Sequence, residues 1–374
     1  MATSIQYSPF TAIFENKAAT TIIIGQPGAG KTFFVLNICA NALMMEQRIY
    51  AIDPKDDLGI LAEIYPDKIE YIDINNILPG SLNPFRVLKV VDTNVITSVV
   101  SIICGGLTDQ QKVSITPIIN DFVIRHRRSK APTSFAALTD YLYANDNLDA
   151  QAIGTKLSIH RDSEYGSLIF DDDEYVSPTV FTQKSKIISL HGMDLPKNAK
   201  KLTEEQMFNS GIVFIVCKML RELLKDHGYP TLFVMDEAHI AFQNPDFSQV
   251  IDEFMVLGRS LNVPTLLASQ SVHHYPPTIA QFVSSKFCFK SSKNDAEEFL
   301  RMFYSSDSDG SADIRSIVNS ITQFGGKLNE QGNPIQGECF YIDSNQRSGF
   351  FRVTSLFGSD VTSNPLLRKR KKIQ

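Results

Sequence analysis

One stretch near the N-terminus, residues 20–36, constrains the fold more than any other part of the chain. Its first part is apolar and β-branched at the consecutive positions 22–24, which is typical of a strand buried on both faces. Three glycines then interrupt the strand and allow backbone angles that a Cβ atom disfavours. An apolar run over residues 33–45 predicts a helix. The stretch therefore predicts a strand, a loop and a helix, as in a parallel sheet covered by helices.

The loop carries the pattern G-x-x-x-x-G-K-[ST], the P-loop. Its backbone N–H groups and the positive end of the following helix surround a phosphate. In this motif Lys31 reaches the β- and γ-phosphates, and the Thr32 hydroxyl takes one position on Mg²⁺. A chance glycine turn is the alternative, and the partner motif described next argues against it. The predicted nucleotide-binding residues are Gly25, Gln26, Pro27, Gly28, Ala29, Gly30, Lys31 and Thr32.

The partner motif follows residues 231–235, where apolar residues run into Asp236 and Glu237. A buried strand that ends in two carboxylates places Asp236 near the Mg²⁺ on Thr32, with Glu237 one step closer to the γ-phosphate. Glu237 is the candidate general base for the attacking water. The alternative is a strand that happens to end in two acids. A further predicted strand, 265–269, ends at Gln270, whose amide is expected to orient the water.

Other polar residues fall where open α/β sheets place their ligands. A second strand over residues 47–53 ends at Asp53, because Pro54 stops it. Candidates for lining the nucleotide site, or for a solvated charged turn, are Asp53, Lys55, Asp56 and Asp57. His239 is expected to cap or pack against a helix rather than to act in catalysis.

The composition limits the classes of function that the chain can have. The net charge of −5 excludes a general polyanion binder, so contact with nucleic acid would need a local patch. The five cysteines are widely spaced, which predicts buried core residues in a reducing compartment. No apolar run approaches the roughly 18 residues of a membrane span. Residues 1–8 lack a signal pattern, and we expect either a natural start there or the motor portion of a longer protein.

The 374 residues exceed a usual single domain. Helical spacing between residues 94 and 147 predicts an insertion of several helices. The basic run 125–130 is either a solvated helix end or a contact for DNA, lipid or a partner. We predict an α/β fold of four parts: a first core segment, 1–92; a mainly helical insertion, 93–178; a second core segment, 179–357; and a basic mobile tail, 358–374.

Seven segments in order resemble the large conjugation ATPase of type IV secretion systems, the VirB/TraC type within the HerA/FtsK group of RecA-like motors. They are residues 25–32, 52–57, 82–85, 234–239, 258–260, 269–270 and 337–340. The resemblance covers nearly the whole chain but only the C-terminal motor half of a usual member. It implies a RecA-like P-loop NTPase with a mainly parallel sheet, which hydrolyses ATP with Mg²⁺.

The resemblance also implies a hexameric ring with ATP at subunit interfaces, and a chain that is weakly associated or monomeric as a fragment. Arg259 is the first candidate for a neighbour's catalytic arginine and Arg347 the second, with a local salt bridge as the alternative for Arg259. The implied partners are inner-membrane channel components, with a coupling protein, relaxase or DNA substrate as further candidates. The implied location is cytoplasmic, at the inner face of the membrane.

Three functions remain open at this point. The first is an ATPase motor that powers assembly of, or passage through, a conjugative secretion machine. The second is the DNA-pumping coupling protein of the same machine, which usually carries transmembrane helices. The third is a nucleotide-gated docking scaffold with little hydrolysis, against which the intact Lys31, Thr32, Asp236 and Glu237 argue.

Overall fold

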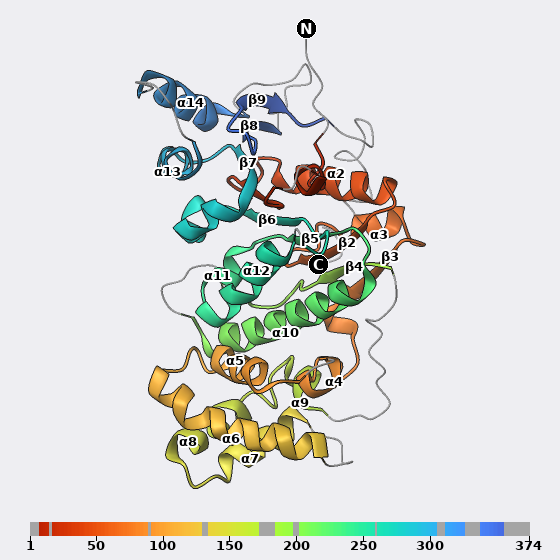
Figure 1. Cartoon of the computed structure of the whole chain (residues 1–374), viewed down its shortest axis with the longest axis vertical. Helices are drawn as coiled ribbons and strands as arrows, with labels where there is room; N and C mark the ends of the chain where they lie inside the picture. The colour runs from red at the N-terminus through yellow and green to blue at the C-terminus, as the bar shows by residue number, and fades with distance from the viewer. Residues whose placement is uncertain are drawn as a thin grey trace.

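The computed structural model describes residues 7–14, 17–88, 91–128, 134–171, 184–196, 202–258, 260–304, 311–325 and 337–354. Its centre is a nine-stranded sheet with the order β3-β4-β2-β5-β6-β1-β7-β8-β9 (Figure 1). The strands are β1 (Thr20–Ile24), β2 (Arg48–Asp53), β3 (Ile69–Asp73), β4 (Ser185–Ser189), β5 (Thr231–Met235), β6 (Thr265–Ser269), β7 (Val283–Phe289), β8 (Glu338–Ile342) and β9 (Ser348–Arg352).

The first seven strands are parallel, and β8 and β9 extend the sheet as an antiparallel hairpin. The P-loop strand β1 is central, between β6 and β7, and Ile22 lies opposite Leu267 of β6. All five residues of β1 are buried, as the apolar run at 22–24 predicts for a strand covered on both faces. This parallel core with helices on both faces confirms the predicted fold class.

Helices cover both faces of the sheet. In Figure 1, α2 and α3 lie on one side and α10 and α12 on the other, with α5 to α9 beyond α10. The helices are α1 (Thr11–Phe14), α2 (Lys31–Met44), α3 (Ile60–Ile64), α4 (Pro84–Val87), α5 (Thr93–Ile103), α6 (Asp109–Arg128), α7 (Phe135–Tyr143), α8 (Leu148–Ser158), α9 (Gly166–Phe170), α10 (Glu204–His227), α11 (His239–Phe242), α12 (Pro245–Leu257), α13 (Lys293–Phe303) and α14 (Ser311–Gln323), with short 3₁₀ turns at Ile74–Asn76, Val272–His274 and Pro277–Phe282.

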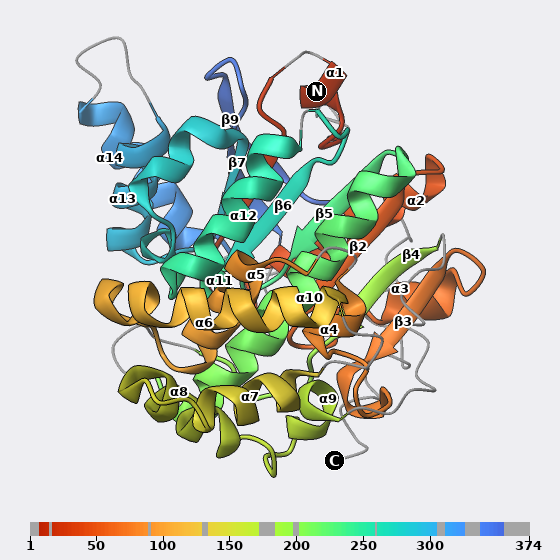
Figure 2. The same cartoon turned by 60° about the horizontal axis from the view of Figure 1, so that its bottom comes forward.

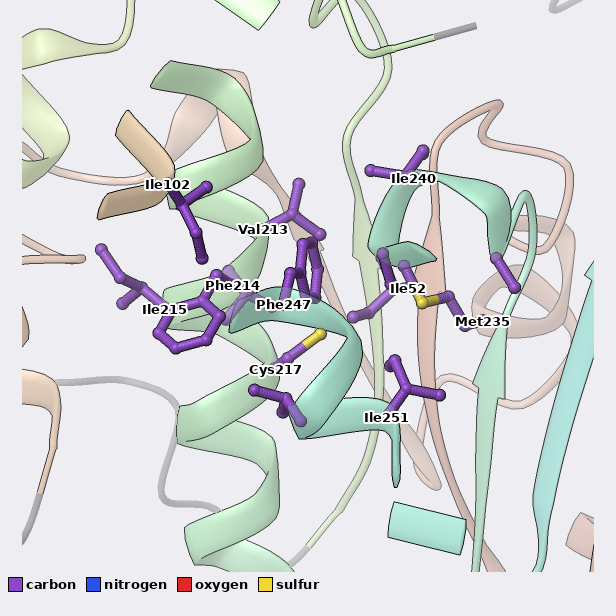
Figure 3. Packing of buried hydrophobic residues seen from close by; sticks show 14 of the residues in the cluster. Ile52, Ile102, Val213, Phe214, Ile215, Cys217, Met235, Ile240, Phe247 and Ile251 are labelled. Atoms are coloured by element: carbon purple, nitrogen blue, oxygen red, sulfur yellow. The ribbon is translucent and has the colours of Figure 1, made fainter. Parts of the chain in front are cut away.

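The core has two halves, because successive residues of a strand point to opposite faces. On β5, Leu232 and Val234 join the cluster under α2, whereas Phe233 and Met235 join the cluster under α10 and α12. Figure 3 shows the second cluster, where Phe247 of α12 packs between α10 and the strands. This cluster continues through α5 into the outer helices. The outer helices therefore share a core with the sheet, and the domain boundaries stay a prediction.

Several elements differ from the sequence-based expectations. The apolar run 208–224 predicts a helix from Phe208, but α10 begins at Glu204, because Thr203 and Gln206 form a reciprocal capping box. The sequence predicts a strand over residues 287–290, whereas β7 covers Val283–Phe289, and α14 was not predicted. All five cysteines are free and buried, as expected. The predicted basic tail and residues 129–130 of the basic run lie outside the described residues, whereas Arg125 within α6 pairs with Asp121.

Candidate functional site

The predicted site residues follow strands that end at one edge of the sheet. Strands β2, β5 and β6 run parallel and side by side (Figure 2), and β1 pairs in parallel with β6. Backbone hydrogen bonds continue past their ends: Gly25 N–H donates to Ser269 O at 3.3 Å, and Asp236 N–H donates to Ile52 O at 3.2 Å. The P-loop, the Asp53 loop, the acidic pair and Gln270 are therefore neighbours, as a crevice at the carboxyl ends of parallel strands requires.

The P-loop has the backbone that phosphate binding needs. Gly30 is the N-cap of α2 with φ 101°, in the left-handed region, and no side chain caps this helix end. The first N–H groups of α2 are thus available to an anion. A Cβ atom at Gly25 would lie 2.7 Å from Phe289 Cβ, so the turn passes too close to β7 for any side chain.

Lys31 points back over its own loop. The side chain is 8% exposed, and its Nζ donates to the carbonyl oxygens of Gly25 and, at 3.1 Å, Gln26. Burial lowers the pKa of Lys31, while the nearby carboxylates of Asp236 and Glu237 oppose that shift. The carboxylates of Asp236 and Glu237 are therefore close enough to the Lys31 ammonium to attract it.

The acidic pair sits at the tip of β5, and both carboxylates are buried. Burial and the neighbouring Glu237 raise the pKa of Asp236 to about 6. Glu237 has φ 55°, a left-handed backbone that costs a non-glycine residue about 1–3 kcal/mol. Such strain is common at functional sites.

Two donors and a histidine ring surround the Glu237 carboxylate. Its Oε1 contacts Lys55 Nζ and accepts from Gln270 Nε2 at 2.9 Å, while its Oε2 lies 3.2 Å from His239 Nδ1. Burial alone would raise the pKa of Glu237, and these donors outweigh it and lower the pKa. The sequence places Gln270 at the tip of the neighbouring strand β6. It did not predict the contacts of Lys55 and His239, which join Glu237 only in the folded chain.

The carboxylate of Asp53 binds backbone groups of its own loop. Its buried carboxylate accepts from the backbone N–H groups of Lys55 at 3.2 Å and Leu58 at 2.7 Å. Burial raises the pKa of Asp53 to about 7. Asp56, in turn, accepts from the Tyr71 hydroxyl at 2.6 Å. Both aspartates thus shape the turn that presents Lys55.

Of the two candidate arginines, Arg259 lies outside the described residues. Arg347 is in the β8–β9 turn, where its Nε donates to Asp343 Oδ2 at 2.6 Å. This turn lies at the amino ends of the parallel strands, whereas the P-loop lies at their carboxyl ends. No group of three His, Cys, Asp or Glu side chains able to hold a metal occurs among the described residues. The assignment of Thr32 and Asp236 as Mg²⁺ ligands stays a prediction.

Comparison with known proteins identifies the family of this chain. The profile of the AAA-like domain family matches residues 14–363. The chain belongs to this family. No curated protein matches this chain. Within the described ranges, we find no helix with the length and apolar character to cross a membrane.

Two solved structures share the fold of this AAA-like domain. VirB4 of Thermoanaerobacter pseudethanolicus is similar with a TM-score of 0.68 and 15% identity, over 94% of this chain and 93% of that one. The plasmid coupling protein TrwB, in complex with the non-hydrolysable GTP analogue GDPNP, is similar with a TM-score of 0.55 and 13% identity, over 90% of this chain and 85% of that one. The expected resemblance to conjugation ATPases is thus confirmed at the level of the fold.

Proposed function

We propose that the chain is an ATP-hydrolysing motor of a conjugative type IV secretion system. The observation that carries this proposal is the meeting of two motifs at one sheet edge. The P-loop presents Lys31 and the uncapped end of α2, and the tip of β5 presents Asp236 and Glu237. A phosphate chain, a metal ion and an attacking water need these groups in one place.

Each residue has a role in the proposed reaction. Lys31 and the loop N–H groups hold the phosphates, and Thr32 and Asp236 hold Mg²⁺, which neutralises charge on the phosphates when bound. Glu237 takes the proton of the attacking water, and Gln270 orients Glu237 through its hydrogen bond to Oε1. The predicted catalytic set is Glu237, Lys31, Gln270 and Arg259, the last supplied by a neighbouring subunit.

The secretion role rests on the likeness to VirB4 and TrwB, and of these two VirB4 has the higher TM-score. By that likeness we propose a hexamer with ATP between subunits, docked on channel components at the inner face of the membrane. The coupling protein, a relaxase or DNA are further candidate partners. The DNA pump remains the second candidate function, because the TrwB fold also covers 90% of the chain.

Phosphate release from ATP, measured with and without single-stranded or duplex DNA, tests this proposal. The motor predicts turnover that needs Mg²⁺ and rises with protein concentration as rings form. Stimulation by DNA would favour the pump. Nucleotide binding without turnover at any concentration would leave a docking scaffold and refute the motor.

A further inference from the structure

Lys55 is held at the sheet edge by its own loop. Asp53 accepts the backbone N–H of Lys55 and, through its other oxygen, that of Leu58. Asp56 has φ 60° and is tied to Tyr71 through its carboxylate. The backbone around Lys55 is thus fixed at several points, whereas its side chain is 44% exposed. A fixed backbone under a long, exposed side chain lets the ammonium move without disturbing the loop.

The present partner of Lys55 is Glu237, whose side chain is only 6% exposed. Lys55 and Gln270 both donate to Oε1 of Glu237. A carboxylate whose oxygen is bonded to an ammonium holds a proton poorly, which suits an ion pair and does not suit a general base. If Oε1 of Glu237 is to take a proton from water, Lys55 has to leave that oxygen.

Another anion site lies within reach of Lys55. Gly25, the first residue of the P-loop, donates its N–H to Ser269 O at 3.3 Å, and the next residue, Gln270, shares Oε1 of Glu237 with Lys55. The P-loop and the Lys55 ammonium are therefore both next to the tip of β6. Lys31 is almost fully buried and bonded to its own loop, whereas Lys55 is half-exposed. The terminal phosphate of a nucleoside triphosphate would enter the space beside this tip with more negative charge than Glu237 carries. A diphosphate lacks that group.

We propose that Lys55 is a ligand of the terminal phosphate of the bound nucleotide, and that it exchanges between this phosphate and Glu237. This inference rests on the proposed function and adds to it a residue that distinguishes triphosphate from diphosphate. Binding of the triphosphate draws the ammonium from Glu237 and so leaves Oε1 to the attacking water. After hydrolysis the ammonium returns to Glu237.

The test measures nucleotide binding rather than turnover, in the Glu237→Gln background. This background matters because removal of Lys55 beside an intact Glu237 would leave a bare negative charge that repels phosphate. We compare Glu237→Gln with Glu237→Gln/Lys55→Met, using ADP and a non-hydrolysable ATP analogue with Mg²⁺. A charge-assisted hydrogen bond is lost only with the triphosphate, so its affinity should fall about tenfold or more while ADP affinity stays within about twofold.

Lys68→Met is the matched control, since the Lys68 side chain is 40% exposed and pairs with Glu46. Lys68 directly precedes β3, so it lies at the amino ends of the parallel strands, away from the nucleotide site. It should change neither affinity. Lys55→Gln is the second variant if Lys55→Met proves unstable in thermal unfolding. No loss of triphosphate affinity would show that Lys55 serves Glu237 alone. Equal losses for both nucleotides would also overturn the inference.

The same data separate this inference from the proposed function. A parent protein that binds neither nucleotide refutes both. A parent that binds nucleotides but releases no phosphate refutes the motor, while the Lys55 comparison still stands on affinity alone.

Discussion

His239 Nδ1 lies 3.2 Å from Oε2 of Glu237, while Nε2 of the same ring lies 2.9 Å from the carbonyl oxygen of Pro196. A carbonyl oxygen only accepts, so Nε2 carries a hydrogen. The contact with Glu237 is then a hydrogen bond only when Nδ1 is protonated as well. This arrangement makes His239 a positioning residue for the proposed base rather than a packing histidine.

Replacement of this ring should therefore weaken hydrolysis without abolishing it. With both ring nitrogens protonated, His239 donates to Glu237 and lowers the pKa of that carboxyl, so in His239→Ala the pKa of Glu237 rises. Because the base acts in its ionised form, the acid limb of the kcat–pH profile should move to higher pH. We expect kcat to fall about three- to tenfold with KM nearly unchanged. His273→Ala, at an exposed ring on the Val272–His274 turn, is the control and should leave both unchanged.

Nucleotide binding depends most on Lys31. Lys31→Ala removes the buried cation of the P-loop and leaves the nearby carboxylates of Asp236 and Glu237 to repel phosphate. We expect loss of measurable ATP and ADP binding by calorimetry, with an unchanged circular dichroism spectrum as the control for folding. Retention of both affinities would show that nucleotide does not bind at this loop.

The pH dependence of binding reports on Asp236. Its pKa is raised to about 6, and Mg²⁺ needs the ionised carboxylate, so protons compete with the metal at lower pH. Binding of Mg²⁺–ATP should weaken about tenfold per unit below pH 6 and level off above pH 7. Asp53 titrates near pH 7, but it faces its own loop. Asp236→Asn should therefore abolish the slope, and an unchanged slope would assign it elsewhere.

Arg259 tests whether subunits share the site. A neighbour's arginine can contribute about 10³–10⁵ in kcat in related phosphoryl-transfer enzymes. Arg259→Ala and Glu237→Gln subunits should each be inactive alone, and mixing them should restore part of the activity at interfaces where both groups are intact. Specific activity should also rise with protein concentration. The absence of both effects would leave Arg259 a structural residue.

Local patterns predicted the parts of the site that are contiguous in sequence. The P-loop is recognised from the spacing of its glycines before Lys31 and Thr32. Asp236 and Glu237 follow a buried apolar strand, so each motif could be recognised without the other. The parallel sheet then explains why Gln270 joins them. The fold class follows from the same alternation of strands and helices.

The contacts of Lys55 and His239 could not be derived in that way. They depend on side-chain directions set by the Asp53 turn and by the left-handed backbone of Glu237. Nothing in the sequence indicates that φ value. Helix α14 was missed although its apolar residues, Ile314, Ile317, Val318 and Ile321, recur at helical spacing, so the sequence did carry a signal for it.

Phosphate release by Glu237→Gln tests directly whether Glu237 is the base of an ATP-hydrolysing site. The amide keeps the shape of the side chain and cannot take the proton. We expect ATP affinity to be kept or increased and kcat to fall about 10²-fold or more, as loss of a general base predicts. Turnover at the parental rate, with ATP still bound, would contradict the assignment.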